Sequence, residues 1–385
     1  MPSYHTLGQI PRKRHTQFRR PDSGLDAEEV FGTEGFSGRE SILYHTYPPT
    51  RVARIESRPN VVLEPWDPGC HRHHHFVTSQ LGAEGDPITS RRVLMANDDV
   101  AIGIARPVEP MTYYYRNARA DEVLFVHEGR GRVRSTLGNL EYRPGDFVII
   151  PRGVTYTIDL AQPDQRWLFF ESFGPVDVPR RYRNEFGQLM EHAPYCERDV
   201  RKPTELETRD ERGDFEVRIK LGPKNVGYWF DFHPLSVVGW DGYLYPWALN
   251  IGDFEPITGR VHQPPPVHQT FQGRNFVICS FVPRKLDYHP EAVPVPYNHS
   301  NIDSDEVIYY VSGSFGSRRG IEIGSITLHP HGIPHGPQPG AVEASLGKES
   351  TDELAVMIDT FRPLHLTKPA AAIDDPKYPF SWLSS

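Results

Sequence analysis

The sequence predicts an all-β fold of two jelly-roll barrels, with short helices and long loops. Short runs of β-branched and aromatic residues recur between turn residues, a pattern typical of strands: VLFVHEG, DFVIIPRG, RWLFFESFG, NFVICSFVP, EVIYYVSG and ELAVMIDTF. The 37 prolines and 32 glycines among 385 residues interrupt helices and central strands, so short elements and many turns are expected. The third observation is that one strand and its following turns occur twice.

This internal repeat begins at Asp121–Val126, which corresponds to Asp305–Tyr310. In both copies a glycine stands seven residues after the glutamate, and a Gly-x5-Pro-x-Gly unit follows further on. The matched positions are Gly129, Gly145, Pro151 and Gly153 in the first copy and Gly313, Gly324, Pro330 and Gly332 in the second. Glycine and proline at strand ends set tight turns, and two hairpin-rich blocks favour jelly rolls centred near 110–175 and 295–362.

The repeat spacing resembles the two signature motifs of the cupin superfamily, H-x-H-x(3,4)-E-x(6)-G and G-x(5)-P-x-G-x(2)-H. In the second copy, His299, Glu306 and His335 fall on the first histidine, the glutamate and the last histidine, while Asn301 replaces the second histidine. Two imidazoles and one carboxylate leave neighbouring coordination positions open, which suits non-haem Fe(II). Each residue alone would more often be an ordinary turn histidine or a solvated carboxylate. Their joint fit to one template favours a metal site.

The first copy carries different residues at the same template positions. Tyr115, Asn117 and Tyr156 replace the three histidines, and only Glu122 is kept. Neutral tyrosine is a poor ligand for a divalent metal, so we expect the first barrel to be metal-free.

Four regions are expected along the chain. Residues 1–93 form an N-terminal arm and strands that pack on the barrels, and residues 94–185 form the metal-free barrel. Residues 186–294 form a linker and a substrate-pocket segment, and residues 295–385 form the second barrel, with the metal site and a tail. The best helix candidate is Arg183–Ala193.

Composition narrows the classes of protein and of partner. The net charge of −8 disfavours nucleic acid as a partner. No window approaches the ~18 uncharged apolar residues of a membrane helix, and the N-terminus lacks a secretory signal. The scattered Cys70, Cys196 and Cys279 exclude a disulfide framework and a cysteine-built zinc site. We therefore expect a cytoplasmic protein that binds neither nucleic acid nor membranes.

Other histidines compete for a role in the site. His329 and His331 flank a proline and are expected to form a wall around the ligands. The His71–His75 cluster is expected to be a solvated loop, because it lies outside either barrel template. His262 and His268 bracket a triple proline that fixes an extended backbone, so either imidazole could act as a base near the metal, or the prolines could merely stiffen a loop.

At this point the sequence resembles the homogentisate 1,2-dioxygenase family, which are iron-dependent bicupins. The likeness rests on PYNHSNIDSDEV, PHGPQPG, FFESFGPVDVPRRYRNEFGQL, VVGWDGYLYPWALNIGDFEP and DELAVMIDTFRPL; it covers about the C-terminal two thirds and fades before Leu94. The family spaces its first histidine and glutamate one residue closer, which would select Asp305. The distance to Gly313 and the first copy both favour Glu306.

The resemblance implies a role for each candidate residue. The iron ligands would be His299, Glu306 and His335. His262 falls at the family's proton-accepting histidine, with His268 as its rival. The candidate substrate-binding residues are Tyr297, Asn301 and Phe315, the last standing where the family motif has a tyrosine.

These observations predict an Fe(II)-dependent ring-cleaving dioxygenase that acts on homogentisate or a closely related dihydroxylated aromatic. The expected partners are a small aromatic substrate and O₂, and the family implies a homo-oligomer. A gentisate- or hydroquinone-type dioxygenase is the nearest alternative. A metal-dependent cupin isomerase and a non-catalytic bicupin binding protein remain open as well.

Overall fold

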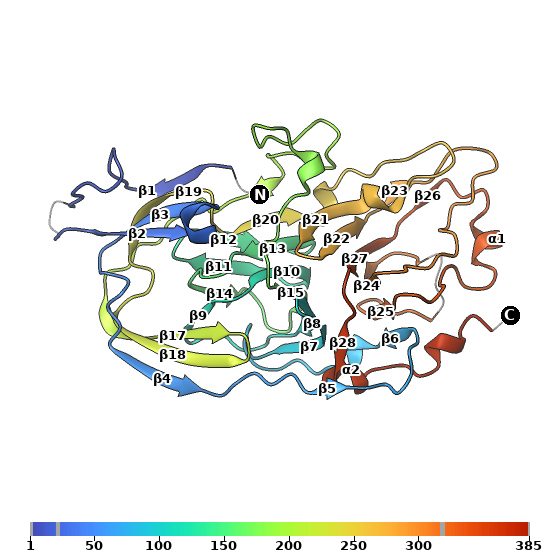
Figure 1. The fold of residues 1–385 in the computed structure, drawn as a ribbon, viewed down its shortest axis with the longest axis horizontal. Helices are drawn as coiled ribbons and strands as arrows, with labels where there is room; N and C mark the ends of the chain where they lie inside the picture. The colour runs from blue at the N-terminus through green and yellow to red at the C-terminus, as the bar shows by residue number, and fades with distance from the viewer. Residues whose placement is uncertain (1–2, 21–23, 316–319, 384–385) are drawn as a thin grey trace.

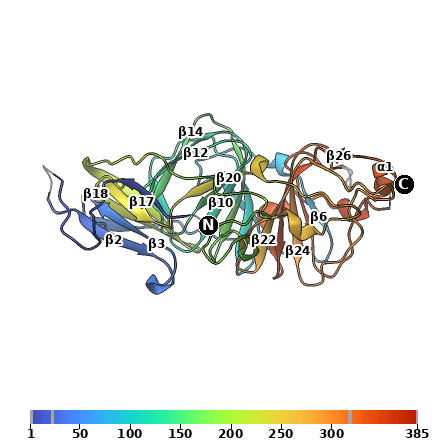
Figure 2. The same ribbon diagram turned by 90° about the horizontal axis from the view of Figure 1, so that it is seen from above.

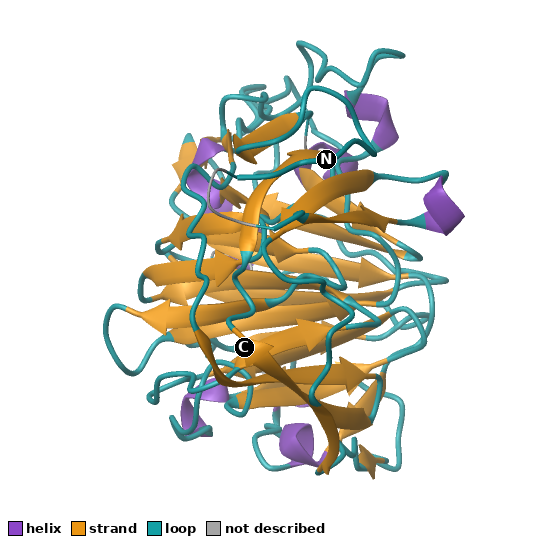
Figure 3. Cartoon of the chain, turned by 90° about the vertical axis from the view of Figure 1, so that its left-hand side faces the viewer, coloured by secondary structure: helices purple, strands orange, loops and turns teal. Residues whose placement is uncertain are grey.

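The computed structural model describes residues 3–20, 24–315 and 320–383, and β-strands dominate it (Figure 1). Within these ranges the α-helices are two short segments, α1 (Ala341–Ser345) and α2 (Lys368–Ala371). Strands fill the interior, and the few helical turns lie at the periphery (Figure 3). The prediction of an all-β fold with cupin-type barrels is confirmed. Over the same ranges, no helix combines the length and apolar character needed to cross a membrane.

The first barrel is built around two sheets that share one hydrophobic core. One sheet runs in the order β16 (Val200–Arg201), β20 (Trp247–Asn250), β13 (Asp146–Ile150), β10 (Asp121–Glu128), β15 (Arg166–Ser172), β8 (Val100–Ala105), β7 (Arg91–Ala96), β28 (His365–Thr367) and β5 (Pro65–Trp66). The other runs in the order β12 (Gly138–Tyr142), β11 (Gly131–Ser135), β14 (Tyr156–Leu160), β9 (Tyr114–Asn117), β17 (Arg212–Leu221), β18 (Lys224–Phe232) and β4 (Arg54–Arg58).

The second barrel lies beside the first along the long axis of the molecule, and a small N-terminal sheet lies at the opposite end (Figures 1 and 2). The main sheet of the second barrel runs in the order β21 (Gln269–Gly273), β22 (Phe276–Phe281), β27 (Leu354–Thr360), β24 (Asp305–Ser312), β25 (Ile326–His329) and β6 (His74–Phe76). A short pair joins β23 (Arg284–Lys285) to β26 (Ser350–Thr351). The N-terminal sheet runs in the order β1 (His5–Gly8), β19 (Val237–Gly242), β3 (Glu40–His45) and β2 (Ala27–Gly32).

The sequence repeat appears as a repeated strand order. The first barrel has β20-β13-β10-β15-β8, and the second has β6-β25-β24-β27-β22. The glycines that end the two central strands, Gly129 and Gly313, have φ of +108° and +87°, a region that glycine enters at little cost. A Cβ on Gly313 would also lie 2.1 Å from the carbonyl oxygen of Asp352. The glycine spacing therefore marks real turns.

Strands from distant parts of the chain complete each barrel. β6, within residues 1–93, pairs with β25, and β20, within residues 186–294, pairs with β13. β21 and β22, also within residues 186–294, belong to the second barrel. The four-region division stays a prediction, and these pairings show that the sheets cross its boundaries.

The helix predicted at Arg183–Ala193 is wrong. Arg183 instead forms an isolated bridge with Leu189, and Gly187 has φ of +82°. The side-chain oxygen of Asn184 accepts hydrogen bonds from the backbone N–H groups of Phe186 and Gln188. Such an asparagine turn competes with helix formation.

Aromatic contacts join the two barrels through their central strands. The ring of Phe125 on β10 lies 6.3 Å from the ring of Tyr309 on β24. His127 Nδ1 lies 2.5 Å from the hydroxyl of the same tyrosine. Because both central strands contact one another, the two barrels pack as neighbours.

Candidate metal centre

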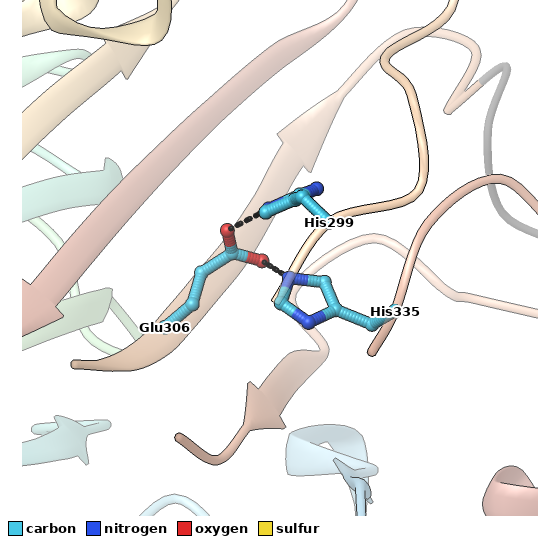
Figure 4. A group of neighbouring side chains, drawn as sticks. All are labelled: His299, Glu306 and His335. Atoms are coloured by element: carbon cyan, nitrogen blue, oxygen red, sulfur yellow. Dashed lines mark ion pairs between the residues drawn. The ribbon is translucent and has the colours of Figure 1, made fainter. Parts of the chain in front are cut away.

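Three predicted ligands from three segments lie together in the second barrel (Figure 4). Glu306 is on β24, His299 precedes this strand, and His335 follows β25. The backbones of the two histidines pair, with His299 N–H donating to His335 O at 2.8 Å and His335 N–H donating to His299 O at 2.9 Å. This isolated bridge holds both imidazoles beside the carboxylate.

The geometry of the three side chains leaves ligand atoms facing one another. His299 Nε2 lies 3.6 Å from Glu306 Oε2, and His335 Nε2 lies 3.3 Å from Glu306 Oε1. One candidate ligand atom from each residue lies within 4.8 Å of the others. His299 Nδ1 donates to Tyr297 O at 3.1 Å, which leaves its Nε2 directed toward Glu306. His335 Nε2 is buried and has no hydrogen-bond partner within the described residues.

A third imidazole supports the glutamate from behind. His329 Nδ1 lies 2.7 Å from Glu306 Oε1, and its Nε2 lies 3.0 Å from the Tyr378 hydroxyl. Burial alone would raise the pKa of Glu306, but the three surrounding imidazoles, with His329 in hydrogen-bond contact, hold that pKa well below its usual range. The carboxylate is therefore ionised. Tyr378 was not predicted, because nothing near it in the sequence marks its approach to β25.

The neighbouring carboxylate, Asp305, faces away from this group. It accepts hydrogen bonds from the backbone N–H of His331 at 2.9 Å and from the backbone N–H of Leu364 at 2.7 Å. Its Oδ1 also lies 2.8 Å from His331 Nδ1. Because adjacent residues of a strand point to opposite faces, Glu306 faces the imidazoles of His299 and His335, whereas Asp305 faces that of His331.

A second carboxylate shares the face of Glu306. Asp359 on β27 lies directly opposite Glu306 in the antiparallel ladder, so both side chains project to the same side. Its Oδ1 is buried and takes no hydrogen bond within the described residues. Burial and the charge of Glu306 raise the pKa of Asp359 to about 8. This residue was not predicted.

The prediction of a solvated loop at the His71–His75 cluster is wrong for its last three residues, whereas His71 is exposed. His73, His74 and His75 are 8%, 3% and 4% exposed. The segment enters β6, the edge strand beside β25, and His74 Nδ1 lies 2.9 Å from an Asp374 carboxylate oxygen. The His73 ring lies 5.9 Å from the His335 ring. Long-range strand pairing thus buries His74 and His75, and His73 packs beside the candidate ligand His335.

The two candidate bases occupy different environments. His262 is exposed, and its ring lies 5.1 Å from the ring of Tyr297, which in turn lies 6.0 Å from the ring of His299. His268 is buried, with its ring 4.6 Å from that of Phe281. Burial and the nearby charge of Arg284 lower the pKa of His268 to about 3, so it is a weak base at neutral pH.

The remaining predicted residues divide between the two ends of β24. The backbone oxygen of Asn301 accepts a hydrogen bond from Gly332 N at 2.7 Å, which ties the loops of the two candidate histidine ligands together. Phe315 packs on Tyr310 with ring centres 4.7 Å apart, four residues beyond Glu306 along the chain. The structure therefore groups Tyr297 and Asn301 with the ligand loops and places Phe315 beyond the other end of the strand.

In the first barrel, the corresponding glutamate, Glu122, forms an ion pair with an arginine of the chain, Arg91. Arg91 Nη1 donates to Glu122 Oε1, and Arg91 Nη2 donates to the Tyr156 hydroxyl at 3.3 Å. Tyr156 donates to Glu122 Oε2 at 2.5 Å. Glu171, opposite Glu122 in the ladder, accepts from Lys220 Nζ at 2.5 and 2.7 Å. Two buried carboxylates are thus matched by two basic side chains.

The repeated barrels and the two-histidine, one-glutamate group define the protein as a cupin with a candidate metal centre. The model of the homogentisate 1,2-dioxygenase N-terminal family matches residues 72–251. The chain is 46% identical over 385 residues to the "Putative dioxygenase SSO1533" of Saccharolobus solfataricus, covering 99% of each chain. The chain belongs to the homogentisate 1,2-dioxygenase family of dioxygenases.

The chain is also similar to more distant proteins. The homogentisate 1,2-dioxygenase of Bradyrhizobium diazoefficiens is 25% identical over 274 residues, which cover 67% of this chain and 59% of that enzyme. Among solved structures, a Bacillus subtilis oxalate decarboxylase aligns with a TM-score of 0.36 and 11% identity, covering 77% of this chain and 79% of that one. The family match begins at residue 72, so the resemblance expected to fade before Leu94 reaches further, into the segment of β6 and β7.

Proposed function

We propose that this dioxygenase uses Fe(II) to cleave the ring of homogentisate or of a closely related dihydroxylated aromatic. The observation that carries the proposal is the convergence of His299, Glu306 and His335, with ligand atoms within 4.8 Å of one another. When bound, Fe(II) supplies adjacent coordination positions for a chelating phenolate and for O₂. The family assignment favours an aromatic substrate with these properties.

Charge balance within the two barrels supports a divalent cation. In the first barrel Arg91 and Lys220 face the carboxylates of Glu122 and Glu171. In the second barrel the corresponding carboxylates are Glu306 and Asp359. Among the described ion pairs, Glu306 is met by imidazoles alone. Because a buried ionised carboxylate such as Glu306 requires compensating charge, a bound divalent ion fits this donor set.

The remaining roles follow from position. His262, exposed near Tyr297 at the ligand loops, is proposed to take the proton of the substrate hydroxyl, whereas buried His268 is too weak a base. Tyr297 and Asn301 are proposed to orient the ring. Phe315 stays a weaker candidate for this task, because it lies beyond the other end of β24. By analogy with the family we also expect a homo-oligomer in the cytoplasm.

Oxygen uptake by ferrous-loaded protein tests the function. We expect uptake with homogentisate in a panel that includes gentisate and hydroquinone. Oxygen uptake only with another ring would reassign the substrate. No oxygen uptake with any compound of the panel, by protein that contains iron, would overturn the dioxygenase assignment in favour of an isomerase or a binding protein. His335→Ala should retain less than a tenth of the wild-type iron. Tyr156→Phe in the first barrel is the control and should retain all of it.

A further inference from the structure

Asp359 is a buried carboxylate beside the candidate metal ligands that has no role in the activity proposed above. It lies opposite Glu306 in the β24–β27 ladder, where paired residues have Cα atoms about 5 Å apart and side chains on the same side. The next strand places Val277 opposite Asp359, so no charged residue faces it from β22 at this level. The carboxylate therefore lies on the same side of the sheet as Glu306, close enough for the charges of Glu306 and His299 to act on it.

The carboxylate lacks the partners that a structural role would require. Its Oδ1 is buried and accepts no hydrogen bond from any described group. Buried polar atoms in native proteins are nearly always satisfied, and an exception calls for an explanation such as a catalytic role or a bound water or ion. The residue as a whole is only partly buried, although its Oδ1 is not exposed.

The first barrel shows how the fold satisfies this position when no ligand is needed. Glu171, the counterpart of Asp359, takes two hydrogen bonds from Lys220 and lies 3.7 Å from Arg91 Nη1. Within the described part of the second barrel, Asp359 has no such ion pair with lysine or arginine. The contrast within one chain indicates that the partner of Asp359 comes from outside the protein.

We propose that Asp359 is a substrate-contacting residue, whose carboxylate accepts a hydrogen bond from a ring hydroxyl of the aromatic substrate held at the metal. This proposal rests on the proposed function. Such a hydrogen bond would make the centre selective for hydroxylated rings, because a bound ring without that hydroxyl would leave the carboxylate of Asp359 unpaired.

The test replaces Asp359 with leucine, which has a similar size and no acceptor, and with glutamate, which the first barrel uses at this position. Iron content, melting temperature, kcat and KM are measured on both variants and on wild type. Asp359→Leu should keep the iron and melt no lower than wild type, because it removes an unsatisfied buried group. Its kcat/KM should fall roughly 10- to 100-fold, and Asp359→Glu should recover most of the loss. Asp159→Asn, on β14 of the first barrel, is the charge-matched control and should behave as wild type.

Ligand binding gives a readout independent of turnover. Calorimetry under anaerobic conditions compares hydroquinone with phenol, which has one hydroxyl fewer, on the iron-loaded proteins. Wild type should prefer hydroquinone, and Asp359→Leu should lose that preference. Unchanged kcat/KM and preference in this variant would overturn the proposal and leave the dioxygenase assignment standing. Loss of iron from the variant would make Asp359 a metal-holding residue instead. Wild-type protein that neither binds nor oxidises any ring would overturn both proposals.

Discussion

Replacing Arg91 with methionine should destabilise the protein without changing its metal content. The Arg91 side chain is 6% exposed and donates to Glu122, whose side chain is 1% exposed. Methionine has a similar length and no charge, so it would leave two carboxylates facing Lys220 alone. Removing one partner of a buried ion pair costs about 3–5 kcal/mol of the free energy of unfolding.

The expected shift in melting temperature follows from the size of the chain. With an unfolding entropy of about 2.1 cal/mol/K per residue, the whole chain would have about 0.8 kcal/mol/K, so the loss corresponds to a fall of about 4–6 °C. Differential scanning calorimetry measures the shift, and elemental analysis measures the iron. Arg132→Met removes an exposed pair with Glu141 and should move the melting temperature by no more than about 1 °C. An Arg91→Met protein as stable as wild type, or one depleted of iron, would refute the reasoning.

Three further predictions concern the second barrel and the contact between barrels. Burial lowers the pKa of His127 in the folded protein to about 4. Below pH 6.5 this imidazole is therefore protonated in the unfolded chain while it is still neutral in the folded protein, and the free energy of unfolding falls. Lowering the pH from 7.5 to 5 should therefore reduce the free energy of unfolding by about 2 kcal/mol through this residue. In urea unfolding, the same pH change should destabilise His127→Asn by about 2 kcal/mol less than it destabilises wild type. Glu306→Gln should lose its iron on desalting while Asp305→Asn keeps it; equal losses would contradict the choice between these carboxylates. Tyr378→Phe removes the hydrogen bond behind the third imidazole and should weaken iron retention about tenfold against a competing chelator, whereas exposed Tyr288→Phe should not.

The features that depend on local geometry could be predicted from the sequence. Gly129 and Gly313 both occupy positive φ, so their equal distance from a glutamate reports the end of an equivalent strand in each barrel. The same regularity places Glu306, rather than its neighbour, on the face of the imidazoles. Spacing succeeds here because a strand alternates its faces and a turn requires a particular residue at a particular position.

The features that depend on distant pairing could not be predicted in this way. The histidines of β6 look like a solvated run until β25, about 250 residues later, covers them. Leu328 then lies opposite His74, and Asp374 arrives from near the C-terminus to bind its ring. The wrong prediction of a helix at Arg183–Ala193 has a local cause instead, because Gly187 adopts a positive φ and ends the segment in a turn.

The ion pair between Arg91 and Glu122 could be predicted in part from charge balance, although not from motif spacing. Arg91 lies 31 residues before Glu122 in the chain, with no motif around it. The first barrel keeps its glutamate after losing the template histidines, however, and a buried carboxylate needs a compensating charge. That requirement predicts a basic residue somewhere in the fold, although only the pairing of β7 with β8 shows which one it is.

The two barrels therefore satisfy the same pair of buried carboxylates in ways that have different functional consequences. In the first, the arginine is part of the chain, and the arginine–glutamate pair is closed to solvent. In the second, the His299 side chain is 30% exposed, whereas that of His335 is fully buried, so solvent reaches the candidate centre on the side of His299. A cation that the protein binds there, rather than supplies, can present vacant positions toward that open side. This difference in access, together with an unpaired Asp359, is why we assign ring chemistry to the second barrel and a stabilising role to the first.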